Sequence, residues 1–452
     1  MMPTPPAPRG VQTRALVASL IGSSIEWYDY FLYGTVASLV FAKRFFPSSD
    51  ARTGLLLAYA SFGIPFFFRP LGGVVFSHLG DRVGRKVSLV LTLTLMGTAT
   101  VLIGCLPDHA SIGVGAPILL VVLRLIQGLG IGGEWGGALL LAVEHAGPRN
   151  RGLYGSVPQM GVTVGLLLGT IAISLVSRLP EAAFLAWGWR LPFLASAVLV
   201  IVGLWIRKGI DETPAFRAAR ARGEVAKVPL VETLRHHKRA VLLAIGLKVV
   251  ETAPFYVFST FIISYATTQV GLDKVTALNA VTAGTLVCCG TIPLMGRLAD
   301  RVGRRPLYIG GTVAIMLFAV PYFALVGLRS PVMLTLATVV ALGVLWAPVT
   351  AVLGTLYSEI FATNVRYTGV TLGYQIGAAL AGGTAPLVAT TLLAAFDDSW
   401  VPVALYVMLA GAVSLGCILV TRETRGADLA GTGAEAPRAA APAPRAESGE
   451  PR

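Results

Sequence analysis

The sequence has 452 residues, of which 55% are hydrophobic and only 13% are charged. A water-soluble domain carries about a quarter charged residues, so this composition excludes an ordinary soluble enzyme and a secreted disulfide scaffold. The net charge of +13 would suit a protein that binds nucleic acid. The lysines and arginines, however, stand in short clusters between apolar runs, as in the loops of a multi-span membrane protein. We therefore expect no nucleic-acid partner.

Twelve apolar runs follow one another along the chain, and each is long enough to cross a bilayer, which takes about 20 residues. Strand-like alternation is missing, so we predict an all-α polytopic membrane protein with twelve transmembrane helices. The first six runs cover about 15–43, 54–76, 87–106, 117–144, 153–177 and 188–206. The second six cover about 240–268, 275–295, 307–328, 332–360, 367–395 and 400–421. These groups predict two halves, over 15–206 and 240–421.

The placement of Lys and Arg predicts the orientation. If both termini are cytoplasmic, the segments on that side hold 26 of the 36 Lys and Arg, against seven on the other side. We therefore predict a cytoplasmic N-terminal segment (1–14), a cytoplasmic central loop (207–239) and a disordered cytoplasmic tail (422–452). The central loop carries nine basic residues and is expected to lie as an amphipathic helix on the inner leaflet. The expected location is the plasma (inner) membrane.

An internal repeat relates the two halves. Residues 80–86 (G-D-R-V-G-R-K) recur as 299–305 (A-D-R-V-G-R-R), and the spacing of Glu144, Arg151 and Gln159 recurs as Glu359, Arg366 and Gln375. Two six-helix pseudo-repeats are a common architecture of secondary transporters, which bind substrate between the repeats near the membrane midplane.

The repeated residues resemble the major facilitator superfamily. Residues 77–86 are similar to its loop pattern G-x-x-x-D-R-x-G-R-K, and 124–130 (R-L-I-Q-G-L-G) are similar to its R-x-x-Q-G-x-G pattern. Within it, the chain resembles the metabolite:proton symporter family, and most of all the branch that contains shikimate transporters. That likeness rests on 25–31 (I-E-W-Y-D-Y-F), 69–73 (R-P-L-G-G), 132–137 (G-G-E-W-G-G) and 212–216 (E-T-P-A-F). The resemblance implies the major facilitator fold and proton-coupled uptake; other members of the family carry 2-oxoglutarate, citrate, proline or betaine.

Acidic side chains at membrane depth are costly and are therefore candidates for proton coupling. Glu26 and Asp29 lie three residues apart in the first span, so they share a helical face. Two carboxylates close together in a low dielectric cannot both ionise easily, which suits a proton carrier. The alternative is that one of them pairs with a basic residue across the bundle. Glu134, among glycines of the fourth span, is either a further proton site or a helix-to-helix hydrogen bond.

Basic side chains at membrane depth are candidates for holding an anionic substrate. Arg124 can grip a carboxylate bidentately, or it can form a fixed ion pair between the first and fourth helices. Arg69 either faces the cavity or extends toward the membrane surface. Lys248 and Glu251, three residues apart, either pair with each other or belong to the substrate site of the second half. The other predicted substrate contacts are Tyr30, Tyr33, Tyr256, Trp346, Tyr374 and Gln375.

The two D-R-x-G-R loops and the ends of the fourth and tenth spans predict a gate. Their charges can form a network that holds the halves together when the site faces outward and breaks when it faces inward. The alternative is that the basic loops only fix orientation. The predicted network comprises Asp81, Arg82, Arg85, Glu144, Arg151, Asp300, Arg301, Arg304, Glu359 and Arg366.

Together these features predict a transporter and not an enzyme. The five histidines lack metal-ligand spacing, and nucleophile–base motifs and a G-x-x-x-x-G-K-[ST] loop are absent, so we expect no metal and no cofactor. The predicted function is proton-coupled symport of a small organic acid or related metabolite, shikimate-like or dicarboxylate-like, by alternating access in a monomer. Alternatives are uptake of a zwitterion such as proline or betaine, a proton-antiport exporter, a membrane-embedded enzyme and a ligand sensor.

Overall fold

The computed structural model describes residues 9–48, 50–83, 85–132, 135–136, 139, 142–143, 146, 149–208, 233, 235, 237–361 and 366–426. Within these ranges the chain is helical apart from short connections and contains no strand. Glu134, Glu144 and nearly all of the predicted central loop lie outside the described residues. So does the tail beyond residue 426.

The first half contains six long helical segments. The first is α1 (Arg9–Val36), which continues through the π-helical turn η1 (Ala37–Phe41) into α2 (Ala42–Arg44). The others are α3 (Ala51–Val83), α4 (Arg85–Cys105), α6 (Gly115–Ile131), α8 (Arg151–Val176) and α10 (Arg190–Lys208). Short helical turns connect them: α5 (His109–Ile112), α9 (Glu181–Ala183) and η2 (Phe184–Gly188).

The second half repeats this plan. Its first helical segment is α13 (Lys238–Tyr256), η3 (Val257–Phe261) and α14 (Ile262–Thr268) in continuous succession. Then come α15 (Lys274–Val302), α16 (Arg304–Val326), and a segment made of α17 (Pro331–Thr338), η4 (Val339–Leu345) and α18 (Ala347–Ile360). The last two segments are α19 (Arg366–Ala381) with α20 (Ala385–Ala395), and α21 (Val401–Val420).

The helices have the length and polarity of membrane spans. Nine helices among the described residues are long and apolar enough to cross a bilayer, and α4 and α6 contribute shorter apolar stretches. With α1, each of the twelve predicted runs corresponds to a helical segment. Large apolar side chains such as Ile201, Trp205 and Leu317 are exposed on the outside of the bundle, where a bilayer would cover them. The prediction of an all-α polytopic fold is confirmed.

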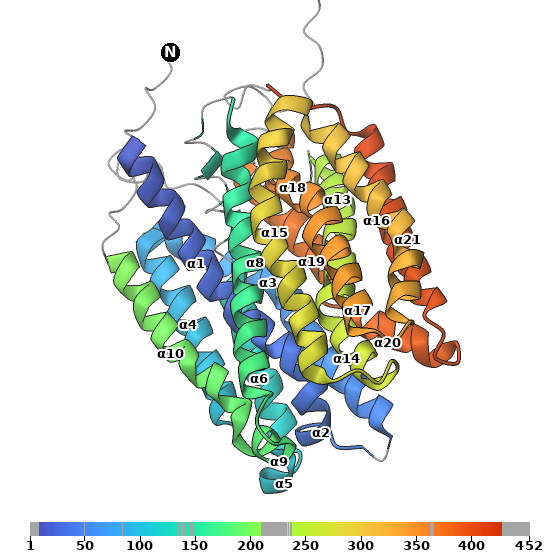
Figure 1. The fold of residues 1–452 in the computed structure, drawn as a ribbon. Helices are drawn as coiled ribbons and strands as arrows, with labels where there is room; N and C mark the ends of the chain where they lie inside the picture. Colours follow the sequence, from blue (N-terminus) through green and yellow to red (C-terminus); the bar gives the residue numbers. More distant parts are fainter. Residues whose placement is uncertain are drawn as a thin grey trace, which may run out of the picture.

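The helices form two bundles that lie side by side (Figure 1). Helix α8 of the first half packs along α1 of its own half and along α15 of the second, and α3 packs against α19. The α8–α15 pair therefore runs through the middle of the molecule. We call the end where α8 begins and α15 finishes the Asp300 end, and the end that carries α9 the Glu181 end; they lie at the top and bottom of Figure 1.

Glycines let α3 and α6 approach backbone to backbone. A Cβ atom added at Gly128 would lie 2.6 Å from the carbonyl oxygen of Pro65, and one at Gly132 would meet the carbonyl oxygen of Arg69. Because only glycine leaves room for this contact, the two residues fix how closely Arg69 is held against the fourth span.

Candidate functional site

A small cavity lies between the two halves. Its volume is about 20 Å³, which is room for about one water molecule. Seven aromatic side chains from both halves line it: Trp27, Phe31, Phe66, Phe255, Tyr256, Trp346 and Tyr374. Three charged side chains also line it: Arg69, Lys248 and Glu251. An organic acid cannot enter a space of this size, so the halves must separate before a substrate binds.

Arg69 is a buried cation with free hydrogen-bond donors. Its side chain is 0% exposed, and its Nε and Nη2 atoms have no acceptor among the described residues. Its guanidinium carbon lies 4.3 Å from the ring centre of Tyr30 and 4.2 Å from that of Phe66. These cation–π contacts partly offset the cost of burial. The donors remain available for an anion.

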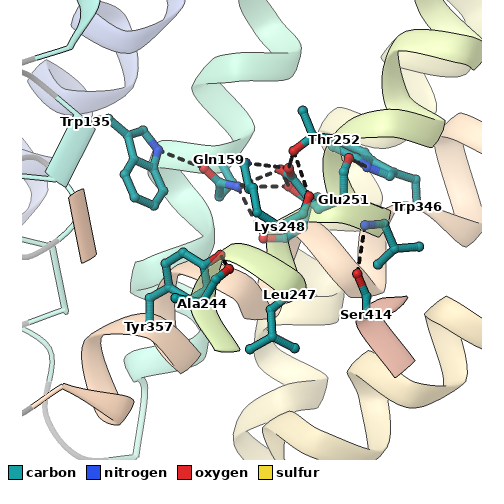
Figure 2. Close-up of polar contacts among 12 residues, drawn as sticks. Trp135, Gln159, Ala244, Leu247, Lys248, Glu251, Thr252, Trp346, Tyr357 and Ser414 are labelled. Atoms are coloured by element: carbon teal, nitrogen blue, oxygen red, sulfur yellow. Dashed lines mark hydrogen bonds and ion pairs between the residues drawn. The ribbon is translucent and has the colours of Figure 1, made fainter. Parts of the chain in front are cut away.

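Lys248 and Glu251 form a buried ion pair at the opposite wall of the cavity (Figure 2). The ammonium group of Lys248 also lies 3.6 Å from the ring centre of Tyr374. The carboxylate of Glu251 accepts hydrogen bonds from Thr252 at 2.8 Å and from Thr350 at 3.2 Å. Buried charges are tolerated when they are paired and hydrogen-bonded in this way.

A glutamine joins this pair to the first half. Gln159 of α8 donates from Nε2 to Thr350 Oγ1 at 3.0 Å and to Glu251 Oε1 at 3.4 Å. Its Oε1 accepts a 3.0 Å hydrogen bond from the indole of Trp135 (Figure 2). The Trp135 ring also stacks on Tyr374 of the second half. The sequence indicated Gln159 only through its repeat counterpart Gln375, and it gave no sign of Thr350.

A second polar cluster is buried inside the first half. Arg124 donates from Nη1 to Gln127 at 2.9 Å and from Nη2 to the carbonyl oxygen of Phe62 at 3.0 Å. Its guanidinium carbon lies 3.9 Å from the ring centre of Tyr33, whose hydroxyl is hydrogen-bonded to Ser61. Arg124 does not line the cavity in this closed arrangement.

Asp29 is buried without hydrogen-bond donors. It is 1% exposed, and neither of its carboxylate oxygens has a partner among the described residues. Two hydroxyl groups lie near it: Thr100 donates to the carbonyl oxygen of Met96 at 3.0 Å, and Ser196 donates to that of Pro192 at 3.5 Å. An ionised carboxylate in such surroundings is unfavourable, so the site favours the protonated acid.

The remaining predicted contacts fall into two groups. Tyr256, Trp346 and Tyr374 line the cavity, whereas Tyr30 and Gln375 are buried and do not line it. Glu26 is 5% exposed and does not line the cavity, and it has interaction partners of its own. Glu134 lies outside the described residues.

At the Asp300 end, part of the predicted gate is assembled. Asp300 of α15 accepts hydrogen bonds from the backbone amides of Gly152, at 2.8 Å, and Leu153, at 3.0 Å, at the start of α8. A carboxylate at a helix N-terminus is favourable because the free N–H groups point toward it. Asp300 also pairs with Arg304 at 3.2 Å, and Arg304 pairs with Glu359 at 3.3 Å. Asp300 therefore joins the two halves at this end.

The other predicted gate residues are only partly described by the structure. Arg151 and Arg366 are buried and have partners, and Arg301 lines a cleft of about 810 Å³ at the same end. Asp81, Arg82 and Arg85 have side chains outside the described set, as does Glu144. Their part in the gate stays a prediction.

The Glu181 end carries ion pairs that the sequence did not predict. Glu181 of the first half pairs with Lys274 of the second at 2.5 Å and with Lys43 of its own half at 3.5 Å. Arg52 of the first half pairs with Asp398 of the second at 2.5 Å. The hydrogen bond from Lys274, together with the positive charges of Lys274 and Lys43, holds the pKa of Glu181 below its usual value. The halves thus touch at both ends, and the structure is closed.

Comparison with known proteins places the chain in a family. The model of the Major Facilitator Superfamily matches residues 19–386 and, in a second match, residues 255–447. The chain belongs to the Major Facilitator Superfamily. This membership agrees with the two six-helix bundles and identifies the protein as a membrane transporter and not an enzyme.

Superfamily relatives of this chain are bacterial transporters. The shikimate transporter of Escherichia coli (strain K12) is 41% identical over 416 residues, which cover 91% of this chain and 95% of that protein. The proline/betaine transporter of the same strain is 33% identical over 432 residues, or 93% of this chain and 86% of that protein. Among solved structures, the proton:xylose symporter XylE bound to 6-bromo-6-deoxy-D-glucose superposes with a TM-score of 0.72. At 19% identity over 93% of this chain and 98% of that one, it shows the shared fold.

Proposed function

We propose that this protein is a proton-coupled symporter that carries a small organic anion across the bacterial inner membrane by alternating access. The observation that carries the proposal is the buried guanidinium of Arg69, which lines the cavity between the halves and has donors without an acceptor among the described residues. A carboxylate bound by Arg69 would neutralise this buried charge and favour the closed arrangement, and its departure would favour opening. The shikimate transporter, at 41% identity, supports an organic acid as the cargo.

Proton coupling is assigned to the first helix. Asp29 is the main carrier, because it is buried without a hydrogen-bond donor and so favours the neutral acid. Loss of its proton would place an uncompensated charge inside the first half, which opposes the closed, empty arrangement. Glu26, one helical turn away, and Glu134 remain secondary candidates. In this proposal the protein acts as a monomer. Both termini lie in the cytoplasm, as the distribution of Lys and Arg favours.

Uptake into proteoliposomes tests this function. An inward proton gradient should drive accumulation of labelled shikimate or a related acid, and collapse of the gradient should abolish it. Asp29→Asn should abolish gradient-driven accumulation but leave exchange of labelled for unlabelled acid, since exchange needs no net proton movement. Ser196→Ala, which alters a neighbour of Asp29 without removing a carboxyl group, is the control. If the gradient drives no acid inward and instead drives a cationic dye out, the protein is an exporter.

A zwitterion is the second candidate, because the cavity is rich in aromatic side chains and the proline/betaine transporter is 33% identical. Aromatic rings can hold a quaternary ammonium group. Gradient-driven uptake of labelled betaine or proline, but not of any acid, would favour it.

A further inference from the structure

The charged residues that line the cavity sum to a single positive charge. Arg69 and Lys248 contribute two positive charges and Glu251 one negative charge. Glu26 and Asp29 do not line the cavity, and as the proposed proton carriers they are neutral when substrate is bound. The electrostatic complement of this lining is an anion with one negative charge.

Lys248 is not free to bind an anion. Its ammonium group is paired with Glu251 one helical turn further along α13 (Figure 2). Glu251 in turn accepts from Thr252, Thr350 and Gln159, so donors from three helices hold its carboxylate in place. The pair is therefore a neutral, hydrogen-bonded unit in the wall of the site.

Arg69, by contrast, presents an unoccupied edge. Its Nε and Nη2 groups have no acceptor among the described residues, and the side chain is 0% exposed. The Nε–H and one Nη–H of a guanidinium form a side-on fork that matches the two oxygens of one carboxylate. One carboxylate satisfies this fork, and the lining offers no second free cation.

Resting on the function proposed above, we propose that the site selects anions with a single carboxylate and that Glu251 is the specificity-determining residue. Because Glu251 neutralises Lys248, a second carboxylate on the substrate would find no free cation. It would also be repelled by the negative charge of Glu251, so the site excludes it. A betaine has no net charge, so it complements the single positive charge of the lining less well than an anion with one carboxylate.

Matched pairs of acids test the proposal. Purified protein in proteoliposomes under an inward proton gradient is given labelled shikimate, and then lactate against malate and pyruvate against oxaloacetate as one- and two-carboxylate probes. Binding is measured in parallel by tryptophan fluorescence, since Trp27 and Trp346 line the site. The wild type should prefer the one-carboxylate probes by at least tenfold. Glu251→Gln frees Lys248 and should shift the preference at least tenfold toward two carboxylates.

The double variant Lys248→Gln/Glu251→Gln removes the pair but keeps the lining charge at one positive. It should restore the wild-type preference, which would assign the shift in Glu251→Gln to the freed Lys248. Equal uptake of one- and two-carboxylate acids by the wild type overturns the selectivity while leaving organic-anion symport intact. If Glu251→Gln keeps the wild-type preference, the role of Glu251 in selectivity is overturned, and organic-anion symport again stands. Uptake of no acid at all under the gradient overturns the proposed function itself.

Discussion

Gln159 of α8 donates a 3.0 Å hydrogen bond to Thr350 of α18, and the two residues come from opposite halves of the molecule. The same amide reaches Glu251 and accepts from Trp135. A single side chain thus links the first half to the buried ion pair of the second at the level of the cavity. Any separation of the halves must break the hydrogen bonds from Gln159 to Thr350 and Glu251.

Gln159→Ala should therefore favour separation of the halves. Loss of two or three buried hydrogen bonds costs roughly 1–3 kcal/mol, so the separated state should become at least about fivefold more populated. Cys289 of α15 offers a native probe, because its thiol lies 3.5 Å from Thr163 of α8. With the other three cysteines replaced by serine, its rate of maleimide labelling should rise severalfold. Thr335→Ala, which removes a hydrogen bond within α17, should leave the rate unchanged.

Arg69→Lys keeps the charge but removes the side-on fork. We expect the affinity for a carboxylate substrate to fall about tenfold, or about 1.4 kcal/mol. Tryptophan fluorescence titration of the purified variant measures this. Arg329→Lys is the matched control, since Arg329 is exposed and does not line the cavity. If Arg69→Lys binds acids with the affinity of the wild type, Arg69 does not bind the substrate carboxylate.

Acid should loosen the Glu181 end. The pKa of Glu181 is held below its usual value by the hydrogen bond from Lys274 and by the charges of Lys274 and Lys43. The link to Lys274 is therefore fully present above the usual glutamate pKa of about 4.3 and is lost as the pH falls through the lowered value. Because Glu181 is half exposed, the shift in population should be small, less than about threefold.

Spin labels at Ala182→Cys and Val275→Cys would report this change as a distance distribution. It should stay constant from pH 8 to pH 5 and broaden in stronger acid. In Glu181→Gln the distribution should already be broad at neutral pH and should not respond to acid. A distribution in the parent protein that broadens between pH 8 and pH 6 would contradict the assignment to Glu181.

Gly128→Ala should destabilise the first half. The added Cβ would lie 2.6 Å from the carbonyl oxygen of Pro65 and 2.8 Å from its Cα, so α3 and α6 would have to move apart. Overpacking of this kind costs roughly 1–3 kcal/mol. The unfolding temperature in detergent should fall. Gly310→Ala in α16, where no atom lies within 4 Å of the added Cβ, should leave it unchanged or raise it slightly through helix propensity.

The location of Asp29 could not be predicted from the sequence alone. The spacing of Glu26 and Asp29 correctly indicates one helical face, yet neither residue lines the cavity. Arg124 likewise does not line the cavity, and its two Nη groups donate to Gln127 and to the carbonyl oxygen of Phe62. Periodicity tells which side chains share a face of one helix. It does not tell how far that helix is rotated about its axis against its neighbours.

The sequence by itself determined the number and order of the spans, the two-fold repeat and the superfamily, because hydrophobic length and recurrent motifs are properties of the chain alone. It also indicated the Lys248–Glu251 pair, since residues three apart on a helix lie close together. Only the tertiary structure decided that Gln159 completes that pair and that Glu181 and Asp398 join the halves. These contacts join residues about 90 to 350 positions apart, and helix packing alone brings them together.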